Sequence, residues 1–206
     1  MEAKTKKSPD KENSGKTWLW GVLLFAVLIF IDQFTKALAD ACLEPGDCIP
    51  VIKGWVNITI VYNRGISYGL GDNAKTWVKI AVIALTGVMM AALTVLYFKV
   101  NKSRKFIRIA LVFVVAGGVG NLIDRVYYKV WQAGGLYGVR DMVDVSRLGF
   151  AVCNFADFFI TAGAIMLVLS FLFFDKDAVF PVGKYKELRD AEAKEKEKNS
   201  GAKDNG

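Results

Sequence analysis

The 206-residue chain contains no histidine and only three cysteines. Histidine is the commonest general base and the commonest metal ligand in proteins, so its absence removes the usual routes to acid–base and metal chemistry. The cysteines, Cys42, Cys48 and Cys153, have no C-x-x-C spacing, which argues against a zinc site or a thioredoxin-like centre. The sequence therefore predicts neither a metal nor a cofactor. For Cys42 and Cys48, a disulfide and two free thiols both remain open.

Apolar residues are abundant and make up 53% of the chain, more than in a typical soluble domain. They cluster in four runs, each close to the ~20 residues that a helix needs to cross ~30 Å of hydrocarbon. The runs are Trp18–Leu38, Trp77–Phe98, Phe106–Val126 and Cys153–Phe174. Because lipid cannot satisfy exposed backbone groups, such runs form helices. The sequence thus predicts a membrane all-α protein with four transmembrane helices.

The net charge of +7 indicates an acidic partner, either nucleic acid or anionic lipid. The positions of the charges distinguish between the two. Lysine and arginine flank the apolar runs, which favours membrane lipid over nucleic acid. Basic residues occupy both tails and the loop between the second and third runs, so all three are expected on the cytoplasmic side. We therefore expect a basic cytoplasmic tail at 1–16, a four-span domain at 17–175 and a charged cytoplasmic tail at 176–206. Segments 39–76 and 127–152 then face outward.

The first run has an alternative interpretation as a cleaved signal peptide, because Ala39-Asp40-Ala41 loosely resembles a cleavage site. A polar string separates the apolar core from that site: Asp32, Gln33, Thr35 and Lys36. A cleaved apolar region rarely ends in this way, so a signal anchor retained as the first span fits better.

The outward segments differ from the spans in pattern. Residues 55–62 are rich in β-branched and aromatic side chains, with Val56, Ile58, Ile60 and Tyr62 alternating on one face. Glycines bound this stretch, so a small β-element that rests on the membrane is predicted. Segment 127–152 carries aromatic residues of the kind found in the interfacial belt.

Two aspartates, Asp124 and Asp157, lie inside apolar runs, each near the outward end of its helix. An ionisable side chain in lipid is costly and is read first as functional. Asn121 and Asn154 precede them by three residues and share their helix faces. Two adjacent carboxylates cannot both ionise easily and would share one proton, as aspartic proteolysis requires. The pattern therefore predicts that Asp124 and Asp157 form a catalytic pair.

Structural alternatives exist for the same residues. Asp124 could pair with Arg125 as an interfacial anchor, and the asparagines could hold helices together. Asp32 and Lys36, four residues apart, are expected to form a structural pair. For the whole chain, one alternative function is a small transporter or proton relay, and another is a non-enzymatic scaffold.

Five motifs occur in an order that resembles the lipoprotein signal peptidases (bacterial signal peptidase II), over about residues 17–175. The motifs are Asp32-Gln33-Phe34-Thr35-Lys36, Asn63-Arg64-Gly65-Ile66-Ser67-Tyr68-Gly69, Gly117-Gly118-Val119-Gly120-Asn121-Leu122-Ile123-Asp124-Arg125, Val143-Asp144 and Asn154-Phe155-Ala156-Asp157. The third and fifth are long and specific. Cys153 and Val145 depart from the family, which usually has phenylalanine at both positions.

The resemblance implies a four-span aspartic endopeptidase of the bacterial inner membrane, with an outward β-cradle and an outward interfacial helix. Such enzymes cleave prolipoproteins just before a diacylglyceryl-modified cysteine and are inhibited by globomycin. The family's catalytic pair is matched here to Asp124 and Asp157. Supporting positions correspond to Lys36, Asn63, Asn121, Arg125 and Asn154. We expect a monomer with its active site near the outer face, a lipidated prolipoprotein and membrane lipid as partners, and no nucleic acid.

Overall fold

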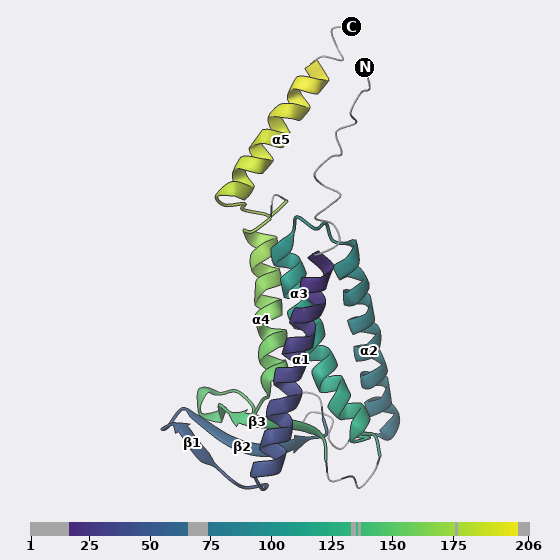
Figure 1. Ribbon diagram of the computed structural model, residues 1–206, viewed down its shortest axis with the longest axis vertical. Coiled ribbons are helices and arrows are strands. Elements are labelled where there is room, and N and C mark those ends of the chain that lie inside the picture. Colours follow the sequence, from purple (N-terminus) through teal and green to yellow (C-terminus); the bar gives the residue numbers. More distant parts are fainter. Residues whose placement is uncertain (1–16, 66–73, 133–134, 136, 176, 202–206) are drawn as a thin grey trace, which may run out of the picture.

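The computed structural model describes residues 17–201, apart from 66–73, 133–134, 136 and 176 (Figure 1). The elements are α1 (Thr17–Cys42), β1 (Ile49–Ile52), β2 (Val56–Asn63), α2 (Thr76–Lys99), α3 (Lys105–Tyr127), β3 (Val139–Asp144), the 3-10 turn η2 (Ser146–Leu148), α4 (Phe155–Leu172) and α5 (Lys184–Gly201). The predicted N-terminal tail and the Ile66–Gly69 part of the second motif lie outside the described residues.

Among the described residues, four helices are long and apolar enough to cross a membrane, which confirms the predicted architecture. The first continues past Leu38 to Cys42, and the fourth begins at Phe155 instead of Cys153. The later start has a local cause. Cys153 forms a β-bridge with Val143, so its backbone is extended and cannot join the helix.

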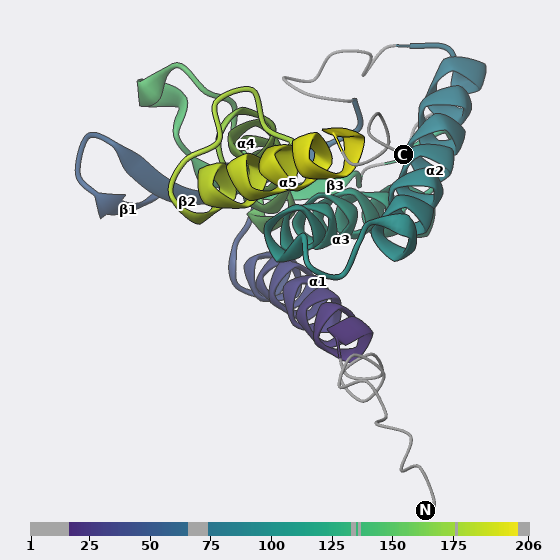
Figure 2. The ribbon, with the colours of Figure 1, turned by 90° about the horizontal axis from the view of Figure 1, so that it is seen from above.

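Helix α3 forms the centre of the bundle, with α1, α2 and α4 packed around it (Figure 2). Its glycines explain how three neighbours approach so closely. A Cβ at Gly117 would collide with the backbone of α4, one at Gly118 with Met90 of α2, and one at Gly120 with Asp32 of α1. The glycine-rich motif therefore serves contacts with three different helices.

The sheet lies at one end of the bundle, and its strands run antiparallel in the order β1-β2-β3 (Figure 1). The predicted strand is confirmed as β2, and Ile60 on it is buried with Ala39 and Met142. Strand β3 falls in segment 127–152, for which the sequence predicts only interfacial aromatics. There the described residues contain β3 followed by the single turn η2.

Strand β3 is tied to the start of α4, and this connection places the site. Val143 and Cys153 exchange backbone hydrogen bonds of 2.8 and 3.0 Å, and Asn154 then caps α4. This connection holds residues on β3 beside the first turn of α4. Both segments are distant in sequence from α3.

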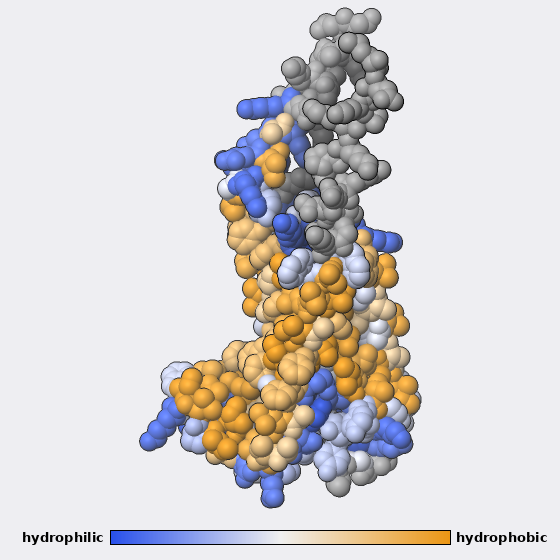
Figure 3. All heavy atoms as spheres, viewed as in Figure 1, coloured by the Kyte–Doolittle hydropathy of each residue, from blue (hydrophilic) through white to orange (hydrophobic). Residues whose placement is uncertain are grey.

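Apolar residues cover the middle of the bundle, and hydrophilic residues gather at its two ends (Figure 3). The edge of the sheet is an exception, because Ile49, Val51, Ile52 and Trp55 are all more than half exposed. At the other end, α5 extends away from the spans, and Arg104 pairs with Asp175 at 3.4 Å. Cys42 and Cys48 are both free and exposed.

Candidate active site

Asp157 lies in the first turn of α4, where two asparagines hold its carboxylate. Its Oδ1 accepts a hydrogen bond from Nδ2 of Asn121 at 2.8 Å, and its Oδ2 accepts from the backbone N–H of Asn154 at 3.1 Å. Oδ1 of Asn154 in turn accepts from the backbone N–H of Asp157, which completes a capping box. These donors and the positive end of the helix suit a negative charge. The carboxylate is thus fixed in one orientation while remaining partly exposed.

Asp141 on β3 is the second carboxylate at this place, and its side chain is 3% exposed. One oxygen accepts from Nδ2 of Asn154 at 2.6 Å, and the other accepts from Nδ2 of Asn63 at 3.1 Å. Burial, and next the negative charge of Asp157, raise the pKa of Asp141 to about 7, against the opposing effect of the two amide donors. Asp141 is therefore a carboxyl group that can hold a proton near neutral pH.

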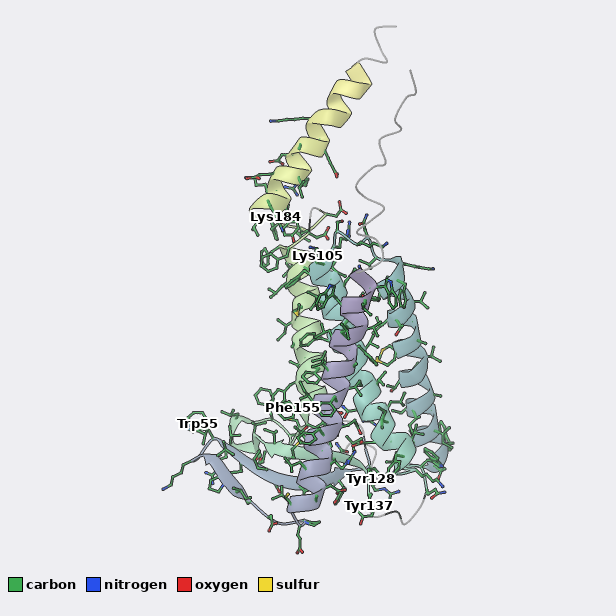
Figure 4. All side chains as sticks on the ribbon, in the orientation of Figure 1. Trp55, Lys105, Tyr128, Tyr137, Phe155 and Lys184 are labelled. Atoms are coloured by element: carbon green, nitrogen blue, oxygen red, sulfur yellow. The ribbon has the colours of Figure 1, made fainter. Side chains whose placement is uncertain are left out.

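Both carboxylates line one cavity of about 580 Å³ at the junction of the sheet and the bundle. Asn63 and Asn121 complete its polar floor, and Arg125 lines the cavity beside them. Its walls are mostly apolar and come from the β3–α4 connection and the first turns of α4: Val145, Leu148, Phe150, Ala151, Val152, Cys153, Phe158 and Ile160. Figure 4 marks the place through Phe155, at the sheet end of α4. The cavity can therefore present two acidic groups to a partly apolar molecule.

Asp124 does not lie on this cavity, so the structure does not show the predicted pairing of Asp124 with Asp157. Its fully buried carboxylate is occupied by Arg140, which donates from its backbone N–H at 3.0 Å, from Nε at 3.2 Å and from Nη2 at 2.8 Å. Nζ of Lys36 lies 3.7 Å from the same carboxylate. With two cations beside it, Asp124 is an ion-pair partner that ties α3 to β3.

Lys36 and Asp32 form the predicted pair on α1, with Nζ and Oδ2 at 2.9 Å and both side chains fully buried. The ammonium also donates to Oδ1 of Asn121 at 3.0 Å, and the other oxygen of Asp32 accepts from the backbone N–H of Ala156 at 2.9 Å. Lys36 therefore lies behind the cavity. Among the described residues, Asn121 links it to Asp157.

The other predicted supporting residues meet at the cavity. Asn154 bridges Asn121 and Asp141 through Nδ2, at 3.0 and 2.6 Å. Arg125 is half-buried beside the floor and donates a long bond of 3.4 Å to the backbone oxygen of Asn121. Four of the five supporting positions thus line the cavity or connect its two carboxylates.

Sequence reasoning misses Asp141 and Arg140. It assigns the motif of this segment to Val143-Asp144, but Asp144 binds Asn57 and the N–H of Ser146 outside the cavity. The hydrogen bonds from Ser146, and then from Asn57, lower the pKa of Asp144. The signal that could have identified Asp141 is its position between Val139 and Val143, because residues two apart share one strand face.

The described residues include no group of three or more histidine, cysteine, aspartate or glutamate side chains arranged to hold a metal ion. What they do include is Asp141, a carboxyl group with a raised pKa, on the same cavity as the hydrogen-bonded carboxylate of Asp157. This arrangement can activate water with one group and donate a proton with the other.

Comparison with known proteins agrees with this architecture. Residues 24–173 match the family model described as signal peptidase (SPase) II. The chain is 33% identical over 157 residues to a lipoprotein signal peptidase of Fusobacterium nucleatum, covering 75% of this chain and 87% of the relative. A lipoprotein signal peptidase of Bifidobacterium longum subsp. infantis is 37% identical over 149 residues, which are 71% of this chain and 75% of that one.

Two solved structures, both described as bacterial membrane enzymes determined by the in meso method, resemble the fold. The first has a TM-score of 0.61 and 27% identity, and the match covers 73% of this chain and 85% of the other. The second has a TM-score of 0.59 and 27% identity, with 74% and 92% covered. Sequence and fold agree that the chain belongs to the signal peptidase II family, that of the lipoprotein signal peptidases.

Proposed function

We propose that this chain is an aspartic endopeptidase that uses Asp141 and Asp157 to cut prolipoproteins just before their diacylglyceryl-modified cysteine. Membership of the family supports removal of signal peptides from prolipoproteins. The observation that carries the aspartic mechanism is that these two carboxylates line one cavity and that the charge on Asp157 helps to raise the pKa of Asp141.

The chemistry follows from the unequal surroundings of the two groups. Asp157, ionised, takes a proton from a water molecule, whose oxygen attacks the scissile carbonyl carbon. Asp141, protonated, donates to the carbonyl oxygen as negative charge develops there. Collapse of the tetrahedral intermediate breaks the C–N bond, and the proton taken up by Asp157 passes to the leaving amine. As the carbonyl re-forms, a hydroxyl of the intermediate returns a proton to Asp141. Water is consumed, and both carboxyl groups return to their starting states.

The supporting residues position this pair. Asn154 holds both carboxylates, Asn121 orients Asp157, and Asn63 orients Asp141. Arg125 beside the floor is placed to bind a backbone carbonyl of the substrate. Lys36 acts through Asn121, and Asp124 acts as a structural brace through Arg140, so neither touches the reacting atoms.

The cavity suits a lipid-modified peptide, because mostly apolar walls adjoin its two carboxylates at the sheet end of the bundle. The acyl chains of the substrate could then stay in the adjoining leaflet while the peptide bond meets the carboxylates. Globomycin would compete for the same cavity. The basic loop at the opposite end favours a cytoplasmic position for both termini in the inner membrane, with the active site near the outer face. The chain would act as a monomer with membrane lipid around it.

A proton relay or transporter remains the main alternative function. Such a protein would need titratable groups spaced through the membrane, whereas Asp32, Lys36, Asp124 and Asp157 all gather at the sheet end of their helices. A non-enzymatic scaffold would tolerate replacement of each carboxylate by its amide.

The test is cleavage of a lipidated and an unlipidated precursor by the purified enzyme and its variants. Asp141→Asn and Asp157→Asn should each lose more than a thousandfold in rate, because each removes a group that acts in the transition state. Asp144→Asn is the matched control, since Asp144 lies on the same strand but outside the cavity. Retention of turnover by the Asp141 variant would remove that residue from the mechanism.

A further inference from the structure

A second hollow lies in the half of the bundle remote from the sheet. Helices α1 and α2 both pack on α3 but make little contact with each other. The groove between them has a volume of about 210 Å³ and is floored by Leu111, Val115 and Val119 of α3. Its sides include Val22 of α1 and Tyr97 of α2, and almost all of its surface is apolar. The groove is thus apolar and is bordered by three of the spans.

A buried cation, Arg108, contacts one of the residues that border this groove. Arg108 lies one turn before Leu111 on α3, in the i, i+3, i+7 and i+11 series that continues with Val115 and Val119, so it shares their face. The side chain is 8% exposed, and its guanidinium stands 4.4 Å from the centre of the Tyr97 ring. Tyr97 therefore borders both the groove and the cation.

Arg108 has no anionic partner within the part of the chain that the structure describes. Its Nε is buried without a hydrogen-bond partner there, and no ion pair among those residues includes it. Burying a cation in this way is costly unless an anion joins it. An anion that reached Arg108 from outside these residues would have to be compatible with lipid, because Arg108 lies inside a candidate span.

We propose that this groove binds an anionic phospholipid of the leaflet on the side of the chain termini. The phosphate pairs with the guanidinium of Arg108 at headgroup depth, and one acyl chain lies in the groove between α1 and α2. An arginine fork suits phosphate geometry, and the apolar groove, whose lining follows α3 from Leu111 to Val119, complements the tail. Charge argues against a signal-peptide helix as the occupant, because its basic end would face Arg108.

The site stands apart from the proposed active site at the opposite end of the bundle, so the two proposals can fail separately. The probe is phosphatidylglycerol, titrated against the purified full chain in detergent and counted by native mass spectrometry. One molecule should bind specifically, and Arg108→Gln should weaken its binding about tenfold or more, as expected for loss of a charged hydrogen bond. Lys105→Gln is the matched control. It removes the same charge from an exposed position at the same end of α3, marked in Figure 4, and should change the affinity less than twofold.

The tail of the lipid is tested from the other side of the groove. Val22→Phe fills the groove and leaves Arg108 intact, so it should also weaken binding of phosphatidylglycerol. Val27→Phe, on an exposed part of α1 outside the lining, should not. Phosphatidylglycerol should raise the Tm of the wild type and of Val27→Phe but not that of Val22→Phe. Equal binding of phosphatidylglycerol by Arg108→Gln and Lys105→Gln would overturn the proposal. A synthetic signal-peptide helix that displaces the lipid, and that binds to Arg108→Gln better than to the wild type, would also overturn it.

Discussion

Asn154 donates a 2.6 Å hydrogen bond from its side-chain amide to Asp141, while its backbone amide donates to Asp157. One residue therefore fixes both carboxylates of the proposed pair. It does so from the N-cap of α4, where its own side-chain oxygen is used by the backbone N–H of Asp157. The geometry of the site and the start of the helix thus depend on the same side chain.

Asn154→Ala should consequently impair both catalysis and stability. Loss of the cap should lower the free energy of unfolding by about 1 kcal/mol. Loss of the bridge should reduce kcat about a hundredfold, because Asp141 and Asp157 would no longer be aligned on one water molecule. Cleavage kinetics and thermal unfolding of the same preparation measure both effects. A normal kcat in a destabilised variant would mean that the cap matters but the bridge does not.

Asp124→Asn should lower stability but preserve activity, whereas Asp141→Asn should preserve stability but abolish activity. Removing one partner of a buried ion pair leaves Arg140 unpaired and should cost about 3–5 kcal/mol of stability. The protein that remains folded should still cleave, because Asp124 is not on the cavity. Asp141→Asn should instead accumulate normally and be inactive.

The double variant Asp124→Asn/Arg140→Gln separates the two roles of Asp124. It removes both charges, so much of the lost stability should return. Tm and turnover per folded molecule are the measurements. An Asp124→Asn protein that folds normally but is inactive would restore Asp124 to the catalytic pair predicted from the sequence.

The spans were predictable from the sequence, because runs of apolar residues report directly on the membrane. The strand β2 was predictable from its alternating pattern. The polar residues at the sheet end were also identifiable, since Asn121, Asn154 and Asp157 are polar side chains inside apolar runs of the sequence. These features all depend on neighbours within one element.

The pairing of the carboxylates was not predictable in this way. Asp124 and Asp157 have similar depth on adjacent helices, and depth alone makes them candidates for a pair. The direction of each side chain is decided by partners remote in sequence: Arg140 occupies Asp124, and the β3–α4 bridge brings Asp141 to Asp157. Recognising β3 would have required treating residues 139–144 as a strand paired with β2. That pairing joins segments remote in sequence, and no local turn pattern indicates it.

The rate should depend on pH through Asp141. Its pKa is raised to about 7, so kcat/KM should fall as the pH rises through this value and the acid loses its proton. Asn63 donates to this carboxyl and favours its ionised form. Asn63→Leu should therefore shift the alkaline limb of the profile to higher pH, even if the maximal rate falls. If the alkaline limb of Asn63→Leu lies at the same pH as that of the wild type, the titration behind it belongs to a group other than Asp141.

Stability should change over the same range. Between about pH 4 and about pH 7 the folded chain holds a proton on Asp141 that the unfolded chain has lost. The contribution of this group to stability is therefore complete below about pH 4 and is lost as the pH rises through about 7. Asp141→Asn should show a flatter dependence of Tm on pH than the wild type. Parallel curves for the two proteins would contradict the raised pKa.

Gly120 should be intolerant of a side chain, because its face of α3 contacts the charged pair of α1. A Cβ at Gly120 would collide with the carboxylate of Asp32, which binds Lys36 and the backbone N–H of Ala156. Gly120→Ala should therefore cost about 1–3 kcal/mol through overpacking and reduce the rate by disturbing the start of α4. Gly87→Ala is the control, since its Cβ would meet only Leu122, at 3.9 Å. That variant should be neutral or slightly stabilised, because alanine favours a helix over glycine by about 1 kcal/mol. Thermal unfolding measures the Tm of the two variants. Equal Tm values would mean that α1 and α3 are not close enough at Gly120 for a Cβ to collide with Asp32.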